Sequence, residues 1–216
     1  MSKKLIARIL MSLSGVIICA FAVGILKIAA LGVDPFQSFM SGLNKLIPIS
    51  FGTLYMVVNG LLLLFSIVFD RSNIGIATFI NLFLLGYVTD FSLMLLSKVF
   101  VNPGIVTRIV LLLVAIVIIC FGSSLYMTAS LGVSTYDAIA ITMSGKWKLG
   151  KFKTIRTITD FICVILGVVL YLIGGGNIRE VTAFVGVGTI ITAFFMGPLI
   201  ELFNNRFSVP LLSKYE

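Results

Sequence analysis

The sequence predicts an all-α polytopic membrane protein, a single membrane domain over residues 1–216 with six transmembrane helices arranged as a 3+3 inverted repeat. Composition is the first reason. Hydrophobic residues make up 59% of the chain and charged residues 11%, whereas a soluble domain carries about 25% charged residues. The second reason is a set of six apolar runs of the length that crosses a bilayer. The third is self-similarity between the two halves of the chain.

The predicted spans are helices, because in hydrocarbon every backbone N–H needs an internal partner. They cover residues 9–31, 51–69, 75–97, 105–130, 154–173 and 180–203. Basic residues precede the first run, and Ala20-Phe21-Ala22 inside it is similar to a signal-peptide cleavage site. The apolar run continues past Ala22, so we expect a retained span.

The repeat units are residues 9–97 and 109–203. Matching segments occur in the same order in both units, and in the third span the match runs from Thr78 through Gly86 to Asp90 and from Thr189 through Gly197 to Glu201. The other matched pairs are Ala30–Val33 with Ser130–Val133, Phe51–Thr53 with Phe152–Thr154, and Asn59 with Asp160. Because each unit holds three spans, the second unit enters the membrane from the opposite face, which predicts an inverted repeat.

The distribution of basic residues supports this topology independently. Short cytoplasmic loops collect Lys and Arg, and with both termini in the cytoplasm that side receives eleven of the sixteen basic residues. They are Lys3, Lys4, Arg8, Arg71, Lys146, Lys148, Lys151, Lys153, Arg156, Arg206 and Lys214.

Each unit also predicts a helix break after its first span. Gly32 suits the end of a helix, Asp34 an N-cap and Pro35 the first helical position, while Gln37 would complete a capping box. In the second unit the corresponding residues are Gly132, Ser134 and Asp137. A short helix follows the break in each unit, and the one after the first break is amphipathic. It is too short to span, and either lies in the interface or re-enters the membrane.

Polar residues at such breaks and inside the spans are the candidate site. A charged side chain at membrane depth costs a few kcal/mol, so the presence of Asp160 inside a span calls for a partner or a function. Arg156, four residues earlier on the same helical face, could form an ion pair with it. The candidate substrate-binding residues are Asp34, Gln37, Asn59, Asn81, Tyr136, Asp137 and Asp160. The structural alternative is that Asp34 and Asp137 only cap their helices and that Asp90 and Glu201 are a pair of interface acids.

Several chemistries are excluded. The chain has no His, which removes His-dependent zinc sites and Ser/His or Cys/His nucleophile pairs. Its three cysteines lie in apolar runs and behave as small hydrophobes. We therefore expect no enzyme activity, no catalytic residues, no metal and no cofactor, and no nucleic-acid partner, since there is no solvated basic domain.

Short motifs resemble those of the YczE/YyaS/YitT group of bacterial integral membrane proteins, most of all its YczE branch. They are Ala29–Phe36, Phe51–Thr53, Gly188-Thr189 and Gly197-Pro198. The resemblance implies a multi-pass protein of the bacterial cytoplasmic membrane with duplicated repeats. In some Bacillus relatives the group is associated with making or exporting lipopeptide and polyketide antibiotics, and it supplies no catalytic residues.

Two functions remain open at this stage. The inverted repeat and its matched breaks favour a small-solute transporter or a substrate-binding membrane subunit. The alternative is a non-transport accessory protein that supports membrane-associated antibiotic or lipopeptide biosynthesis or export. The expected partners are the lipid bilayer and an unknown small solute, with a membrane protein partner or a homo-oligomer left open.

Overall fold

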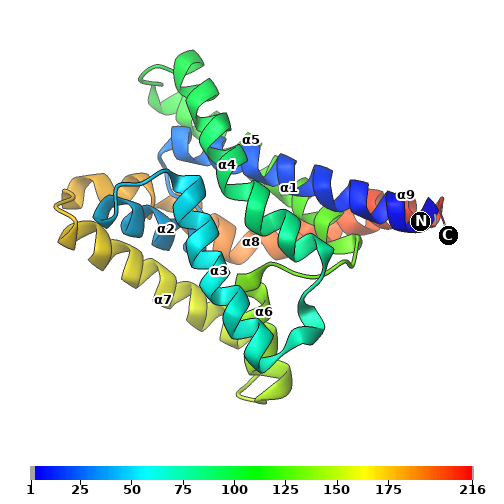
Figure 1. The fold of residues 1–216 in the computed structure, drawn as a ribbon. Coiled ribbons are helices and arrows are strands. Elements are labelled where there is room, and N and C mark those ends of the chain that lie inside the picture. Colours follow the sequence, from blue (N-terminus) through cyan, green and yellow to red (C-terminus); the bar gives the residue numbers. More distant parts are fainter. Residues whose placement is uncertain (1–2, 216) are drawn as a thin grey trace.

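The computed structural model describes residues 3–215, which are helical and contain no β-strand (Figure 1). The α-helices are α1 (Lys3–Ala29), α2 (Pro35–Leu46), α3 (Phe51–Phe69), α4 (Ile76–Val99), α5 (Ile105–Thr128), α6 (Thr135–Ile141), α7 (Phe152–Ile173), α8 (Val187–Phe203) and α9 (Val209–Ser213). Short 3₁₀ or π turns join several of them. Six segments are long and apolar enough to cross a membrane: α1, α3, α4, α5, α7 and the stretch Ile178–Ser213. The predicted fold class is confirmed.

The last predicted span is wrong at its start. Residues 180–203 were expected to form one helix, but Ile178–Ala183 form a 3₁₀ helix and α8 begins only at Val187. Gly186, the N-cap, has extended backbone, and its N–H donates to Thr189 Oγ1 at 3.2 Å. This cap interrupts the apolar run because it packs against the first helix break, a tertiary contact that hydropathy does not register.

Helices α1 and α5 cross at the centre of the molecule in antiparallel directions (Figure 1). A Cβ on Gly15 would lie 2.6 Å from the carbonyl oxygen of Gly122, so the two backbones are in close contact. Cys19 Sγ donates to the Ile119 carbonyl at 3.6 Å in the same crossing. Small residues let membrane helices approach this closely, which explains the glycines inside these spans.

Both predicted helix breaks are present and share their local structure. Gly32 and Gly132 have φ angles of +106° and +111°, which favour glycine. After the first break, Val33 N–H donates to the Phe184 carbonyl at 3.1 Å, and Gly188 N–H donates to the carbonyl of Leu31 at 2.7 Å. The second break forms the matching pair, from Val133 N–H to Asn73 O at 3.0 Å and from Ala77 N–H to Leu131 O at 2.9 Å. The inverted relation of the two repeat units stays a prediction.

Helix α2 runs along α7 (Figure 1). A Cβ on Gly42 would lie 1.9 Å from the carbonyl oxygen of Gly167, and one on Gly174 would lie 3.0 Å from Leu46 N. Residues later in the sequence of α2 therefore contact residues later in the sequence of α7, so the two helices run parallel. Of the two placements left open by the sequence, this favours a short helix that re-enters alongside a span.

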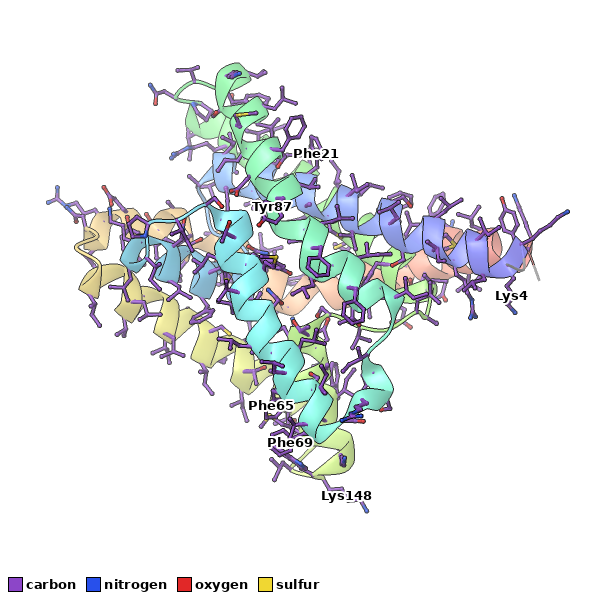
Figure 2. The ribbon with its side chains drawn as sticks, viewed as in Figure 1. Lys4, Phe21, Phe65, Phe69, Tyr87 and Lys148 are labelled. Carbon is purple, nitrogen blue, oxygen red and sulfur yellow. The ribbon has the colours of Figure 1, made fainter. Side chains whose placement is uncertain are left out.

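One end of α3 meets the turn that follows α6. Lys146 Nζ donates to the Phe69 carbonyl, and the ring of Trp147 lies 5.8 Å and 5.3 Å from the rings of Phe65 and Phe69. Figure 2 shows Phe65 and Phe69 beside the segment that carries Lys148. The loops 70–75 and 142–151 therefore lie at the same end of the bundle.

We expect Lys98 and Lys148 to lie on opposite sides of the membrane. Lys98 is in the last turn of α4 and Lys148 precedes α7. The excess of basic residues near Lys148 predicts that this position is cytoplasmic. Lys98→Cys and Lys148→Cys, each in a background without the three native cysteines, should be labelled by an impermeant thiol reagent from opposite sides. The cysteine-free background is the control. Labelling from one side only would contradict both the topology and the inverted repeat.

Candidate functional site

An ionic cluster joins α6 to α7. Arg156 Nε lies 3.2 Å from Asp160 Oδ1, which confirms the ion pair predicted from their spacing on one helix. The other end of the guanidinium, Nη1, bonds to Asp137 Oδ1 on α6. One arginine thus bridges two of the predicted site carboxylates, and its contact with Asp137 is the one that the sequence did not predict.

Tyr136 lies at the centre of this cluster. Its hydroxyl donates to Asp160 Oδ1 at 2.8 Å, and Cys163 Sγ donates to the same hydroxyl at 3.5 Å. One face of the Tyr136 ring is stacked on Phe36 of α2, with centroids 4.7 Å apart. The guanidinium carbon of Arg156 lies 4.2 Å from the ring centroid, a cation–π contact. The two short helices therefore meet where the charged groups gather.

Local sequence explains how these side chains are positioned. Ser134 caps α6: its Oγ accepts from Asp137 N–H at 3.1 Å and donates to Asp137 Oδ2 at 2.6 Å. This fixes one carboxylate at the first turn, as the sequence predicts. On α7, residues three and four apart share a face, which aligns Arg156, Asp160 and Cys163.

A second, neutral network lies beside the ionic cluster. Thr135 Oγ1 donates to Asn59 Oδ1 at 2.6 Å, and Asn59 Nδ2 donates to the Tyr55 carbonyl at 2.9 Å. Tyr55 in turn donates its hydroxyl hydrogen to Asn81 Oδ1 at 3.0 Å. Asn59 and Asn81 are buried. The two asparagines are linked through Tyr55, and their role in substrate binding stays a prediction. In the sequence match between the repeats, the neutral Asn59 corresponds to Asp160.

Asp34 and Gln37 are less directly involved. Asp34 Oδ1 accepts from Gln37 N–H at 3.1 Å, so the aspartate caps α2 and Pro35 follows as the first helical residue. The predicted capping box is wrong in its second half, because Gln37 Oε1 is buried without a hydrogen-bond partner among residues 3–215. Asp34 therefore caps α2 through the Gln37 N–H alone.

A cavity of about 280 Å³ opens between α7 and α8, next to the ionic cluster. Its residues include Pro35, Thr157, Asp160, Phe161, Thr189 and Phe194. Sequence reasoning found only Asp160 of these as a site residue. The remaining wall comes from two spans and one helix break that are distant in the chain, and no local pattern marks them.

The other two acids inside spans differ from one another. Asp90 Oδ2 accepts from Gly52 N–H at 2.7 Å and so stabilises the first turn of α3. Glu201 is exposed. Asp90 therefore has a structural role, and the interpretation of the two acids as an equivalent interface pair stays a prediction.

Comparison with known proteins identifies the family. A model of DUF6198, a family of unknown function, matches residues 6–205. The chain belongs to this DUF6198 family. Two proteins of Bacillus subtilis strain 168 are similar: the uncharacterised membrane protein YczE is 25% identical over 97% of this chain and 89% of its own length. The uncharacterised protein YyaS is 22% identical over 93% of this chain and 94% of its own.

No solved structure matches this chain. DUF6198 membership and the likeness to YczE and YyaS agree with the group that the sequence motifs indicated, and with a membrane protein.

Proposed function

We propose that this DUF6198 protein binds a small solute in the cavity between α7 and α8 and carries it across the bacterial cytoplasmic membrane, as a secondary transporter or its substrate-binding subunit. The observation that carries the proposal is Arg156, which bridges Asp137 and Asp160 beside a cavity that Asp160 lines. Substrate sites of secondary transporters are formed where helices are broken at matching positions of two repeats.

The energetic cost of this cluster supports a function. Ionisable groups inside a membrane protein are expensive and mostly mark substrate, ion or proton pathways. Capping of α6 needs only Ser134, which already accepts from Asp137 N–H. The neutral Asn59 at the position equivalent to Asp160 indicates that packing alone does not require a carboxylate.

The cluster also offers a way to couple binding to movement. Arg156 connects α6 and α7 through its two carboxylates. A solute that competes for Asp160 weakens the ion pair between Arg156 and Asp160. Arg156 then remains paired with Asp137 alone. Such a ligand shifts the conformational equilibrium only to the extent that it binds the two arrangements differently.

Uptake into proteoliposomes tests the proposal. The panel consists of three labelled solutes with low passive permeability: benzamidine, which is a cation with N–H groups at neutral pH, benzenesulfonate and arabinose. Vesicles with the protein should accumulate at least one of them faster than protein-free vesicles. Asp160→Asn should abolish that difference at normal protein incorporation, while Glu201→Gln, the same change at an exposed acid, should retain it.

Uptake of none of the three solutes would contradict this assignment. If the protein then co-purified with a stable membrane partner, the accessory role in membrane-associated biosynthesis or export would be the better explanation. A normal uptake rate in Asp160→Asn would remove this carboxylate from the site.

A further inference from the structure

We infer that the solute is a small organic cation, an amine with an apolar body, and that Asp160 is its counter-ion. This inference rests on the proposed function and names its substrate class. The charges around the cavity are the first argument. Asp137 and Asp160 contribute two negative charges and Arg156 one positive charge, so these three side chains together carry one negative charge. Asp34, next to the lining residue Pro35, is a further acidic group that interacts electrostatically with Arg156 and Asp160. A positive charge on the ligand offsets this excess of acidic groups at membrane depth, where a net charge is costly.

The two oxygens of Asp160 are used unequally. Both the Tyr136 hydroxyl and Arg156 Nε contact Oδ1. No hydrogen bond to Oδ2 is found among residues 3–215, and that oxygen is not sealed from the surface. Because Asp160 lines the cavity, Oδ2 is the acceptor available to a ligand N–H. A ligand can therefore make its first contact at Oδ2 while the ion pair at Oδ1 is intact, and its positive charge then competes with Arg156 for the carboxylate.

The rest of the cavity wall excludes anions. None of its described residues is Lys or Arg. The two lining hydroxyls are committed as donors to the protein: Thr157 Oγ1 donates to the Lys153 carbonyl at 2.9 Å and Thr189 Oγ1 to the Phe184 carbonyl at 3.2 Å. An anionic ligand would thus meet a carboxylate and no free donor, and burying such an unpaired charge is unfavourable.

The size and polarity of the wall define the body of the ligand. The volume of about 280 Å³ is at the small end of ligand pockets. Apart from Asp160 and the two threonines, the wall is apolar, with Phe161 on α7 and Phe194 on α8. A one-ring or short aliphatic body with one charged nitrogen fits this arrangement.

Binding of benzylamine by the purified full-length protein tests the inference, with the neutral isostere benzyl alcohol as the matched probe. Calorimetry at neutral pH should show that the amine binds about tenfold more tightly than the alcohol, a difference of about 1.4 kcal/mol. Asp160→Asn should remove this preference, and Glu201→Gln should retain it.

A second variant keeps the test independent of the folding of Asp160→Asn. Ala193 lines the cavity, and Ala193→Leu fills it while the ionic cluster stays intact, so both probes should lose affinity. Equal affinity of the wild-type protein for amine and alcohol would overturn the inference. Unchanged amine binding in Asp160→Asn or in Ala193→Leu would also overturn it. Proteoliposomes that accumulate benzenesulfonate or arabinose but not the cation would also overturn it, and would leave the proposed transport function standing.

Discussion

Replacing Arg156 with glutamine is expected to destabilise the protein more than any other change of a single charge. Arg156 is the shared partner of Asp137 and Asp160, and its loss leaves two carboxylates facing one another without a cation. Removing one partner of a fully buried ion pair costs about 3–5 kcal/mol. The side chains of Arg156 and Asp137 are 31% and 35% exposed, so screening reduces the expected loss to about 2–3 kcal/mol.

Thermal denaturation of the purified protein in detergent measures this effect. Arg206→Gln removes the same charge from an exposed position and is the matched control, with no expected change. The double variant Arg156→Gln, Asp160→Asn should regain part of the stability, because one of the uncompensated charges is gone. An Arg156→Gln protein as stable as Arg206→Gln would show that the bridge does not contribute to the fold.

Gly42→Ala is expected to have the largest effect among conservative substitutions. Its new Cβ would lie 1.9 Å from the carbonyl oxygen of Gly167, which is backbone and cannot rotate away. Helices α2 and α7 would have to separate, and Phe36 would lose its stacking on Tyr136. Overpacking typically costs about 1–3 kcal/mol, and we expect the upper end here because the obstacle is backbone.

Gly60→Ala is the matched control, since a Cβ at Gly60 meets nothing within 4 Å. The same substitution at this helical position should be neutral or stabilise by up to about 1 kcal/mol, because alanine favours helix more than glycine. The pair is compared by thermal denaturation and by amine binding. If Gly42→Ala retained the stability of Gly60→Ala, the close crossing of α2 and α7 would be wrong.

The sequence by itself determined the features that depend on neighbours along the chain. Hydropathy located six spans, because a bilayer-spanning helix needs a continuous apolar run. The break at Gly32 and its cap Asp34 follow from backbone preference and local hydrogen bonding, and both are present. The ion pair between Arg156 and Asp160 follows from the geometry of one helix.

Only the tertiary structure decided which of these features form a site. Asp137 meets Arg156 because α6 packs against α7; the two residues are 19 positions apart, and the segment between them includes a loop with no fixed period. The cavity beside Asp160 depends on the late start of α8, which Gly186 sets through its contact with the first break. Such contacts join segments far apart in the chain. Their energy comes from packing and hydrogen bonds between elements, so no periodicity within one element records them.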